Sequence, residues 1–521
     1  MNKQKLQIWL PLFISLSMVA GMFIGYKIRD SIPGKSFFSF DKRKPVDEIL
    51  DLINSKYVDT VDLSQLSEIG IQTMLSKLDP HSIYIPTNQL DDINNDIQGN
   101  FYGIGVEFDI FNDTVTILNV LNGSPSEKVG LKKGDQFLTI NNKIITGKLI
   151  NADSIRQLIR GPQGTKIDLT IKREQKEIKF SIPRSTIPIN SIDASFMLNQ
   201  EIGYIKINKF SSHTYSEFMT ALHSLKNKGL KKLILDLRDN GGGVLEEAID
   251  IADEFLEGDK LITYTEGAHM PKKEYRCRRL GQFEEGKLIV LSNEGSASAS
   301  EVLMGALQDW DRATIIGSRS FGKGLVQEQF DLSDHSAVRL TIARYFSPTG
   351  RCIQRSYANG EKAYYDEIDT DSTSRSFNDS SKTFTTPKGK KVYGGGGISP
   401  DIVMTENNIR FSNLIATLFN KGTLNHFAFD FYRQQINVLK NYTTPLKFIS
   451  EYSIPQSAWS SFIIYSNKDS VDIKNISNDE KQVVLKSIKN FIGRNHFSKN
   501  EYFEILMNND QEIKKSMEVL K

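Results

Sequence analysis

Cysteine and histidine are scarce in this chain of 521 residues, which has two cysteines and seven histidines. Neither cysteine has a metal-ligand spacing, and the histidines form no His-Glu-x-x-His or similar cluster. The sequence therefore predicts neither a metal site nor a cofactor. Cys277 and Cys352 allow at most one internal disulfide, and two free buried thiols are an equally good interpretation.

A strong excess of charge of one sign is also missing. The 65 lysines and arginines nearly balance 63 aspartates and glutamates, so the net charge is only +2. This balance gives no reason to expect nucleic-acid binding. The apolar and charged fractions are ordinary, at 39% and 25%, so most of the chain should be folded, and its length predicts several domains.

A long apolar run lies near the N-terminus. Lys3 and Lys5 precede an uncharged segment from Ile8 to Tyr26, which has about the length of one bilayer-spanning helix. A cleaved signal peptide is the alternative, but bulky residues such as Met22 leave no convincing small-residue cleavage site. We therefore expect residues 1–27 to form an uncleaved transmembrane signal anchor, with the rest of the chain outside the cytoplasm.

A small unit of mixed strands and helices follows from about Gly99 to Pro183. Alternating strand patterns are interrupted by turn residues and by two helix patterns, the second of which ends near Arg160. The unit resembles a PDZ domain. The residues that carry this resemblance are Tyr102-Gly103-Ile104-Gly105, the segment from Ser124-Pro125 to Gly130-Leu131, and the turn Gly134-Asp135.

PDZ domains bind peptides as an added strand, and a glycine-containing loop holds the C-terminal carboxylate. The resemblance therefore implies that the loop Tyr102, Gly103, Ile104 and Gly105 binds the C-terminal tails of unstructured proteins.

A run of small residues that contains Ser296, Ser298 and Ser300 stands between a strand-like run, Lys287–Leu291, and a helix-like run, Val302–Trp310. A serine at such a turn is exposed and lies near backbone N–H groups that no helical carbonyl satisfies, and those groups could stabilise an oxyanion. The alternative is structural, because Ser298 and Glu301 have the spacing of a helix-capping box.

Lys323 is the only lysine between Lys287 and Lys362, and glycines flank it in an apolar stretch. Burial of such a lysine would favour its neutral form, which can act as a base, so serine plus lysine can build a hydrolase without histidine. Gln327 could hydrogen-bond the lysine and fix its rotamer. An exposed turn lysine is the simpler alternative.

A glycine-rich loop, Asp239-Asn240-Gly241-Gly242-Gly243, follows a strongly apolar strand pattern. It can be a tight strand-to-helix turn in which glycine relieves backbone strain, or it can direct N–H groups at a developing oxyanion. Phosphate binding is disfavoured, because no Gly-Lys-Ser/Thr follows.

Together these residues resemble the carboxyl-terminal processing proteases, the serine peptidases of family S41, over about Val46 to Asp401. The motifs that carry the resemblance are Asp236-Leu-Arg-Asp-Asn-Gly-Gly-Gly243, Gly295-Ser-Ala-Ser-Ala-Ser-Glu301, Ser320-Phe-Gly-Lys-Gly324 with Gln327, and Gly394-Gly-Gly-Gly-Ile-Ser-Pro-Asp401.

The resemblance implies that Ser298 is the nucleophile, Lys323 the general base and Gln327 its orienting partner. It also implies an oxyanion hole made by the N–H of Ala299 and one from Gly241 or Gly242. Arg160 is a candidate for relaying PDZ occupancy to the Lys323–Gln327 pair.

The fold class expected is a multidomain α/β protein. Its parts are a signal anchor (1–27), a tether and N-terminal helical region (28–97), a PDZ domain (98–185), a protease core related to the crotonase and Clp peptidase fold (186–404) and a helical C-terminal extension (405–521). The core is split, since the N-terminal region joins it from the other side of the PDZ domain.

The function predicted is a membrane-anchored serine endopeptidase of the bacterial envelope or periplasm that recognises the C-terminal tails of exported proteins and cleaves them with a Ser-Lys dyad. An adaptor protein or a second copy of the chain are further partners considered. A catalytically dead PDZ scaffold is the first alternative. A Ser-His-Asp hydrolase that uses a remote histidine, such as His213 or His335, is the second.

Overall fold

The computed structural model describes residues 9, 11, 14–24, 44–111, 113–147, 150–371, 383–404 and 412–521. The chain forms two compact units, residues 1–71 and 72–521, and each is described by itself. In the first unit, residues 14–24 are helical, α2 covers Pro45–Lys56, and α3 (Leu63–Leu75) begins. Among the residues described, no helix has both the length and the apolar character needed to cross a bilayer, so the expected transmembrane helix is not supported there. Much of the expected anchor, residues 1–27, lies outside the described residues.

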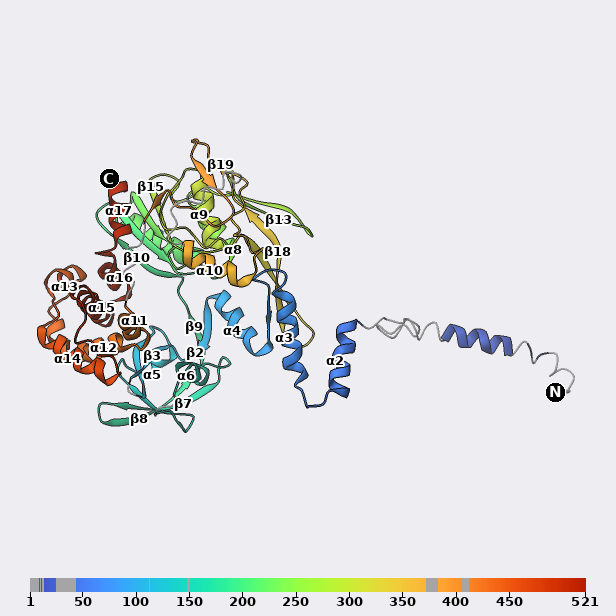
Figure 1. The fold of residues 1–521 in the computed structure, drawn as a ribbon, viewed down its shortest axis with the longest axis horizontal. Coiled ribbons are helices and arrows are strands. Elements are labelled where there is room, and N and C mark those ends of the chain that lie inside the picture. Colours follow the sequence, from blue (N-terminus) through green and yellow to red (C-terminus); the bar gives the residue numbers. More distant parts are fainter. Residues whose placement is uncertain are drawn as a thin grey trace. The chain divides into compact units, whose positions relative to one another are not determined.

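The second unit is built around a six-stranded sheet in the order β10-β11-β12-β15-β16-β21 (Figure 1). Five of its strands run parallel, and β10 pairs antiparallel with β11 at one edge. The strands are β10 (Ile192–Met197), β11 (Ile202–Ile207), β12 (Lys232–Asp236), β15 (Lys287–Ser292), β16 (Thr314–Gly317) and β21 (Ile402–Val403).

Both faces of this sheet are covered, which explains why its strands are almost continuously apolar. Side chains alternate along β12, so Leu233 and Leu235 join one buried cluster while Ile234 joins another. Three helices cover the first face: α7 (Thr214–Asn227), α8 (Leu245–Asp253) and α9 (Ala299–Asp309). The helix α17 (Gln511–Leu520), near the end of the sequence, covers the second face.

A second, antiparallel sheet follows the order β1-β18-β13-β14, and β17 also pairs with β18. It contains β1 (Ile83–Ile85), β13 (Leu261–Gly267), β14 (Met270–Arg276), β17 (Leu325–Asp331) and β18 (Ala337–Phe346). β1 comes from the N-terminal region, within a stretch whose pattern is mostly helical, and α4 (Thr87–Gln98) follows it. The remaining core elements are α10 (Glu361–Asp371) and the hairpin of β19 (Thr383–Thr385) and β20 (Lys391–Tyr393).

A separate five-strand path, β3-β4-β5-β7-β8, forms the domain between the two parts of the core, with β6 paired to β5. Its elements are β3 (Val106–Phe111), β4 (Thr114–Val120), α5 (Pro125–Val129), β5 (Gln136–Ile140), β6 (Lys143–Ile144), α6 (Ala152–Ile159), β7 (Lys166–Arg173) and β8 (Lys176–Pro183). The chain enters and leaves this domain through the paired strands β2 (Asn100–Gly103) and β9 (Ser185–Pro188), which we call the neck.

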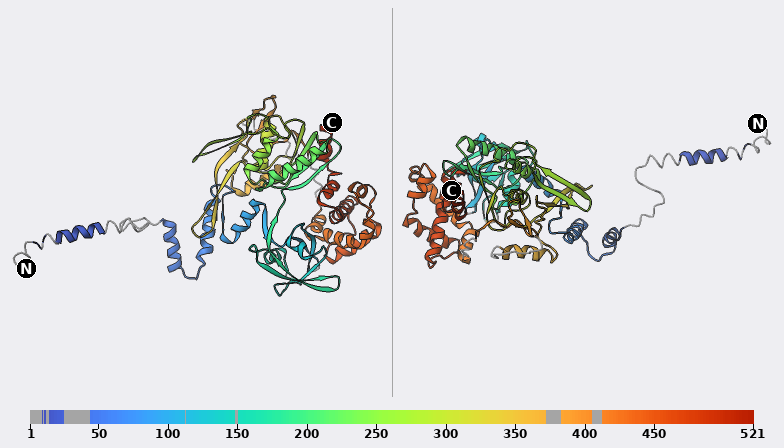
Figure 2. Two further views of the ribbon diagram at one scale, coloured as in Figure 1. Left: turned by 180° about the vertical axis from the view of Figure 1, so that it is seen from behind. Right: turned by 90° about the horizontal axis from the view of Figure 1, so that it is seen from above.

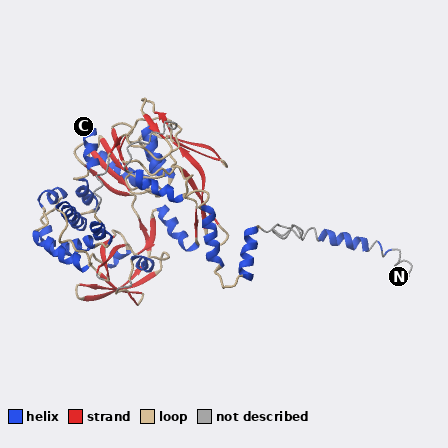
Figure 3. Cartoon of the chain, viewed as in Figure 1, coloured by secondary structure: helices blue, strands red, loops and turns tan. Residues whose placement is uncertain are grey.

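The region after residue 412 is helical, as the sequence predicts, and Figure 3 shows no strand in it among the described residues. Figure 2 shows most of these helices, coloured orange to red, gathered in one cluster with its own apolar core. They are α11 (Asn413–Asn420), α12 (Thr423–Leu439), α13 (Pro445–Glu451), α14 (Gln456–Lys468), α15 (Asn478–His496) and α16 (Lys499–Met507). The expected mixture of core, small domain and helical extension is thus present.

Candidate active site

Ser298 occupies the turn between β15 and α9, and its backbone is strained, with φ 55° and ψ −114°. Ser298 is partly exposed, whereas Ser296 and Ser300 are buried and donate hydrogen bonds to backbone carbonyls of the neighbouring loop. The N–H of Glu301 donates to the Ser298 carbonyl oxygen at 2.8 Å, and the Ser298 hydroxyl makes no capping hydrogen bond. The middle serine is therefore the one whose hydroxyl remains available for chemistry.

Lys323 lies in the loop between β16 and β17, and Gln327 lies on β17. Lys323 Nζ donates to Gln327 Oε1 at 2.9 Å, and Gln327 Nε2 in turn donates to the carbonyl oxygen of His81 at 2.5 Å. Burial lowers the pKa of Lys323, and the nearby charge of Arg339 lowers it further, while Asp79 and Glu301 oppose the change. The shift is in the direction that a general base needs, because only the neutral amine can accept a proton.

No hydrogen bond joins Ser298 Oγ to Lys323 Nζ within the described part of the chain, where the bond of Nζ is the one to Gln327. Both residues nevertheless share Tyr345 as a neighbour, because its hydroxyl donates to the Ser298 carbonyl oxygen at 3.1 Å and to the Lys323 carbonyl oxygen. Catalytic hydrogen bonds are often long or absent without substrate and form when it binds.

Glu301 connects the two halves of the site, which the capping-box interpretation did not anticipate. Its buried carboxylate accepts from the backbone N–H groups of Ser298, Gly322 and Lys323 at 2.8–2.9 Å, and from Ser320 Oγ at 2.6 Å. Three of the four contacts are backbone N–H donors, and their hydrogen bonds lower the pKa of the carboxyl against the larger effect of burial, which raises it. A single side chain thus fixes the spacing between the serine turn and the lysine loop.

His81 is a second residue that sequence reasoning missed. Its carbonyl holds Gln327, and its ring Nε2 lies 3.0 Å from the hydroxyl of Tyr364. Burial, helped by the charge of Lys323, lowers the pKa of His81 to about 4, so the ring is neutral under ordinary conditions. The preceding Asp79-Pro80 is a helix-ending signal in the sequence, but it does not indicate a contact with the site. His213 and His335 are exposed, and neither is hydrogen-bonded to Ser298 among the residues described.

The glycine-rich loop contacts the serine turn directly. The carbonyl of Asn240 accepts from Ala297 N–H at 2.9 Å and from Ser300 Oγ at 2.9 Å. Gly242 has φ +94°, and a Cβ there would lie 2.6 Å from the Ala297 carbonyl oxygen and 2.8 Å from Ser298 Cβ. The serine turn and the loop therefore pack backbone against backbone, which only glycine permits.

The two candidate oxyanion glycines differ in what their N–H groups do. The N–H of Gly242 donates to Asn240 Oδ1 at 2.9 Å. In the part of the chain that the structure describes, the N–H groups of Gly241 and Ala299 donate to no protein acceptor. These two N–H groups are therefore available to bind a substrate oxygen, so the geometry favours Gly241 over Gly242 as the second donor of an oxyanion hole with Ala299.

The predicted tail-binding loop spans the end of β2 and the start of β3. Ile104 is buried, and Gly105 has φ +78° with Ser124 packed where a Cβ would be. β3 is an edge strand of its sheet, so one side of it can accept an added peptide. Arg160 stacks on Phe101, 4.7 Å from the ring centroid, and its nearest carboxylate is Asp92 at 3.7 Å. Neither of these two contacts of Arg160 involves Lys323 or Gln327.

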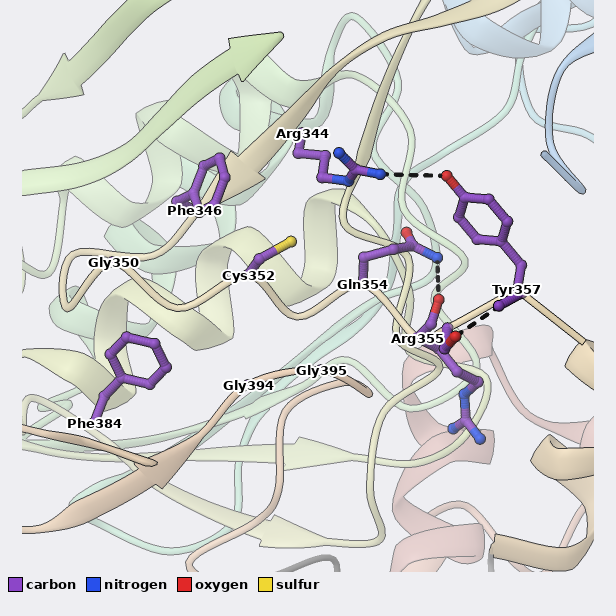
Figure 4. A pocket seen from close by; sticks show the side chains of 12 residues that line it. Arg344, Phe346, Gly350, Cys352, Gln354, Arg355, Tyr357, Phe384, Gly394 and Gly395 are labelled. Carbon is purple, nitrogen blue, oxygen red and sulfur yellow. Dashed lines mark hydrogen bonds between the residues drawn. The ribbon is translucent and has the colours of Figure 1, made fainter. Parts of the chain in front are cut away.

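A cavity of about 660 Å³ borders the lysine loop (Figure 4). Gln354 Oε1 accepts from Gly324 N–H at 2.8 Å, and Arg355 Nε donates to the Phe321 carbonyl oxygen at 3.1 Å, so the cavity wall supports the loop. Cys352 lines the cavity, Cys277 is buried elsewhere, and the two are not joined by the disulfide considered from the sequence.

Comparisons with known proteins identify the families that this chain is similar to. A profile of peptidase family S41 matches residues 201–360, a PDZ domain profile matches 103–183, and a family of unknown function, DUF8443, matches 414–498. A carboxy-terminal-processing protease of Bartonella bacilliformis is 37% identical over 314 residues, covering 59% of this chain and 71% of that protein. A "Probable CtpA-like serine protease" of Staphylococcus aureus is 33% identical over 340 residues, covering 65% of this chain and 67% of that protein. The structure of a photosystem II D1 C-terminal processing protease is similar with a TM-score of 0.36 and 24% identity, covering 68% of this chain and 86% of that one.

Proposed function

Because this chain belongs to peptidase family S41, the serine-type carboxy-terminal-processing peptidases, we propose that Ser298 and Lys323 form its catalytic dyad. The observation that carries the proposal is the set of hydrogen bonds to Glu301, which binds the backbone of both residues at once. The partial exposure of Ser298 and the lowered pKa of Lys323 meet two further requirements of such a dyad.

In the proposed reaction, neutral Lys323 takes the proton of Ser298 Oγ as this oxygen attacks the scissile carbonyl. The negative charge on the carbonyl oxygen is stabilised by the N–H groups of Ala299 and Gly241. Lys323 then gives the proton to the leaving amine, and it activates water to release the acyl group. Gln327, held by the His81 carbonyl, keeps the amine of Lys323 in position.

We further propose that the substrates are exported proteins with unstructured C-terminal tails. The PDZ domain supports this class, because the free edge of β3 and the adjacent loop from Tyr102 to Gly105 have the form that binds a tail as an added strand. Residues 1–27 would anchor the enzyme, with the catalytic part outside the cytoplasm. Fractionation of cells and protease accessibility of the intact chain test this location.

The dyad is tested by cleavage of an unfolded reporter with an apolar C-terminal tail. Wild type, Ser298→Ala and Lys323→Ala are compared as purified proteins, and we expect cleavage by wild type alone, with each variant losing at least about a thousandfold in rate. Full activity of Lys323→Ala would contradict the dyad in favour of a histidine base. The catalytically dead scaffold is not favoured, and equal tail binding without turnover in wild type and Ser298→Ala would be needed to revive it.

A further inference from the structure

Arg238 stands between the end of β12 and the loop that carries the proposed oxyanion donor. Its side chain is 15% exposed and meets three carboxylates: Asp236 Oδ2 at 2.6 Å, Asp510 Oδ2 at 2.8 Å and Glu512 Oε2 at 2.5 Å. Asp236 belongs to the same strand end, but Asp510 and Glu512 begin α17, more than 270 residues further along the chain. They lie outside every segment that the family profiles match.

The backbone of Arg238 is tied to the loop that follows. Its N–H donates to Asp236 Oδ1, and its carbonyl accepts from Lys206 Nζ, both at 2.9 Å. The next residue, Asp239, has φ +62° and exchanges two hydrogen bonds of 2.8 Å with the side chain of Asn293. Only Asn240 then separates this anchored segment from Gly241. Any displacement of Arg238 is therefore transmitted over three residues to the proposed oxyanion donor.

The acidic pair is itself rigidly placed. Asp510 caps α17, since its Oδ1 accepts from the N–H groups of Glu512 and Ile513 at 2.9 and 3.1 Å while its Oδ2 binds Arg238. Ile513 and Leu520 are buried in the cluster on the second face of the central sheet, together with Ile234 of β12. The helix is thus seated on the same strand whose end carries Arg238.

Glu512 also reaches the strand that leads to the lysine loop. A Cβ on Gly317, the last residue of β16, would lie 3.2 Å from Glu512 Oε1, so the carboxylate packs against that backbone. The acidic pair therefore contacts the carboxyl ends of β12 and β16, from which the oxyanion loop and the lysine loop start.

We propose that Asp510 and Glu512 are positioning residues for catalysis: they clamp Arg238, and through it the backbone from Asp239 to Gly241, so that the oxyanion N–H is aimed at the scissile carbonyl. This inference rests on the proposed Ser298–Lys323 chemistry. It assigns a role in the reaction to the segment that begins α17, apart from any function of the helical cluster before it.

The test compares wild type with Asp510→Asn, Glu512→Gln and the double variant, all as full chains. Lys499→Gln is the matched control, because Lys499 makes another ion pair between this region and the core, with Asp193 at 2.7 Å, and does not contact Arg238. We expect the double variant to lose at least about tenfold in kcat, with KM and tail-peptide affinity unchanged within about twofold, since the loss concerns the transition state. Lys499→Gln should match wild type.

Two further readouts separate positioning from general damage. Hydrogen exchange of the full chain should speed up at residues 238–243 in the double variant and not in Lys499→Gln. Above the range in which Glu512 itself titrates, near its raised pKa of about 7, the pH at which activity rises should stay that of wild type, because Lys323 is untouched. Unchanged exchange at residues 238–243, or faster exchange with an unchanged kcat, would overturn the inference.

The same experiment includes Ser298→Ala, which tests the proposed function separately from the role of Asp510 and Glu512. Wild type that cleaves no better than Ser298→Ala would overturn the dyad, and the role in catalysis with it. In contrast, Ser298-dependent cleavage that is equally fast in the double variant would overturn only the role of Asp510 and Glu512.

Discussion

Arg339 and Asp79 act on Lys323 with opposite sign. The cation lowers the pKa of the Lys323 ammonium, and the carboxylate raises it. Since only neutral Lys323 can accept the serine proton, activity should rise with pH through the pKa of this lysine, and a weakly alkaline optimum is expected. Arg339→Gln should move the rise to higher pH, and Asp79→Asn should move it to lower pH, each by about one pH unit.

The measurement is kcat/KM of the purified variants between roughly pH 6 and pH 10. Arg344→Gln is the control, because Arg344 lies on the same strand, is exposed and lines the cavity of Figure 4. Shifts in the same direction for Arg339→Gln and Asp79→Asn would contradict Lys323 as the base.

The adjacent glycines of the oxyanion loop should respond differently to alanine. A Cβ at Gly242 would meet the Ala297 carbonyl oxygen at 2.6 Å, whereas a Cβ at Gly241 has nothing within 4 Å. Gly242→Ala should therefore displace the serine turn and lower kcat by about a hundredfold or more, while Gly241→Ala keeps its N–H and stays within about threefold of wild type. Steady-state cleavage of the reporter by Gly241→Ala and Gly242→Ala is the measurement. An inactive Gly241→Ala would contradict the expected difference and would mean that position 241 tolerates no side chain.

Ser298, Lys323 and Gln327 could be selected from sequence because each lies within a short local pattern. The spacing of Glu301 from Ser298 predicts only a helix cap, although its contacts with residues 320–323 also hold the lysine loop against the serine turn. His81 reaches the site from a segment more than 240 residues away, which no local spacing encodes. Arg238 lies in the motif 236–243, but its partners Asp510 and Glu512 belong to none of the sequence motifs.

At the scale of elements, α9 and the loop before β17 are held together by one carboxylate. Glu301→Gln would place an amide NH₂ among four donors, so at least one N–H or hydroxyl loses its acceptor. We expect kcat to fall by about a hundredfold and the free energy of unfolding to fall by about 3 kcal/mol. Glu294→Gln is the matched control, because this residue bonds Ser318 at the rim of the same turn. The measurements are reporter cleavage and denaturant unfolding. If Glu301→Gln cleaves as fast as wild type, Glu301 does not position the catalytic residues.

The longer strands of the PDZ domain and the strands β11, β12 and β15 of the central sheet could be predicted to within one or two residues, since alternating or continuous apolar runs mark them. The short strands β6, β16 and β21 and the edge strand β10 could not. β1 could not, because three residues carry too little pattern and its partner β18 lies about 250 residues downstream. The helices after residue 412 could be predicted from their periodicity. Their docking sites could not, because an apolar helix face does not identify its partner.

At the scale of the whole second unit, the helical extension touches the PDZ domain as well as the core. Phe429 of α12 stacks on Phe111 of β3 with ring centroids 5.0 Å apart, and the nearby His426 Nε2 lies 3.3 Å from Asp109 Oδ2. Phe429 is 2% exposed, so Phe429→Ala removes a buried aromatic contact and should cost local stability of about 3–5 kcal/mol.

Hydrogen exchange is the measurement for this variant, and β3 and α12 should exchange faster while the central sheet keeps its protection. Phe419→Ala on α11 is the control, because Phe419 is 38% exposed. Unchanged protection of β3 in Phe429→Ala would show that the extension does not brace the PDZ domain.

The neck gives the PDZ domain two ends that already lie side by side, since Gly103 pairs with Ser185 and Asn100 with Pro188. Bridging Gly103 to Ser185 requires a turn of only about two to five residues, so removing the domain leaves the chain connection of the core short, although α12 loses its contact with Phe111. The same arrangement makes the domain an exchangeable cassette. Recombination at the neck can replace the domain by one with a different tail specificity in a single step. The new domain must also present a surface that packs against α12.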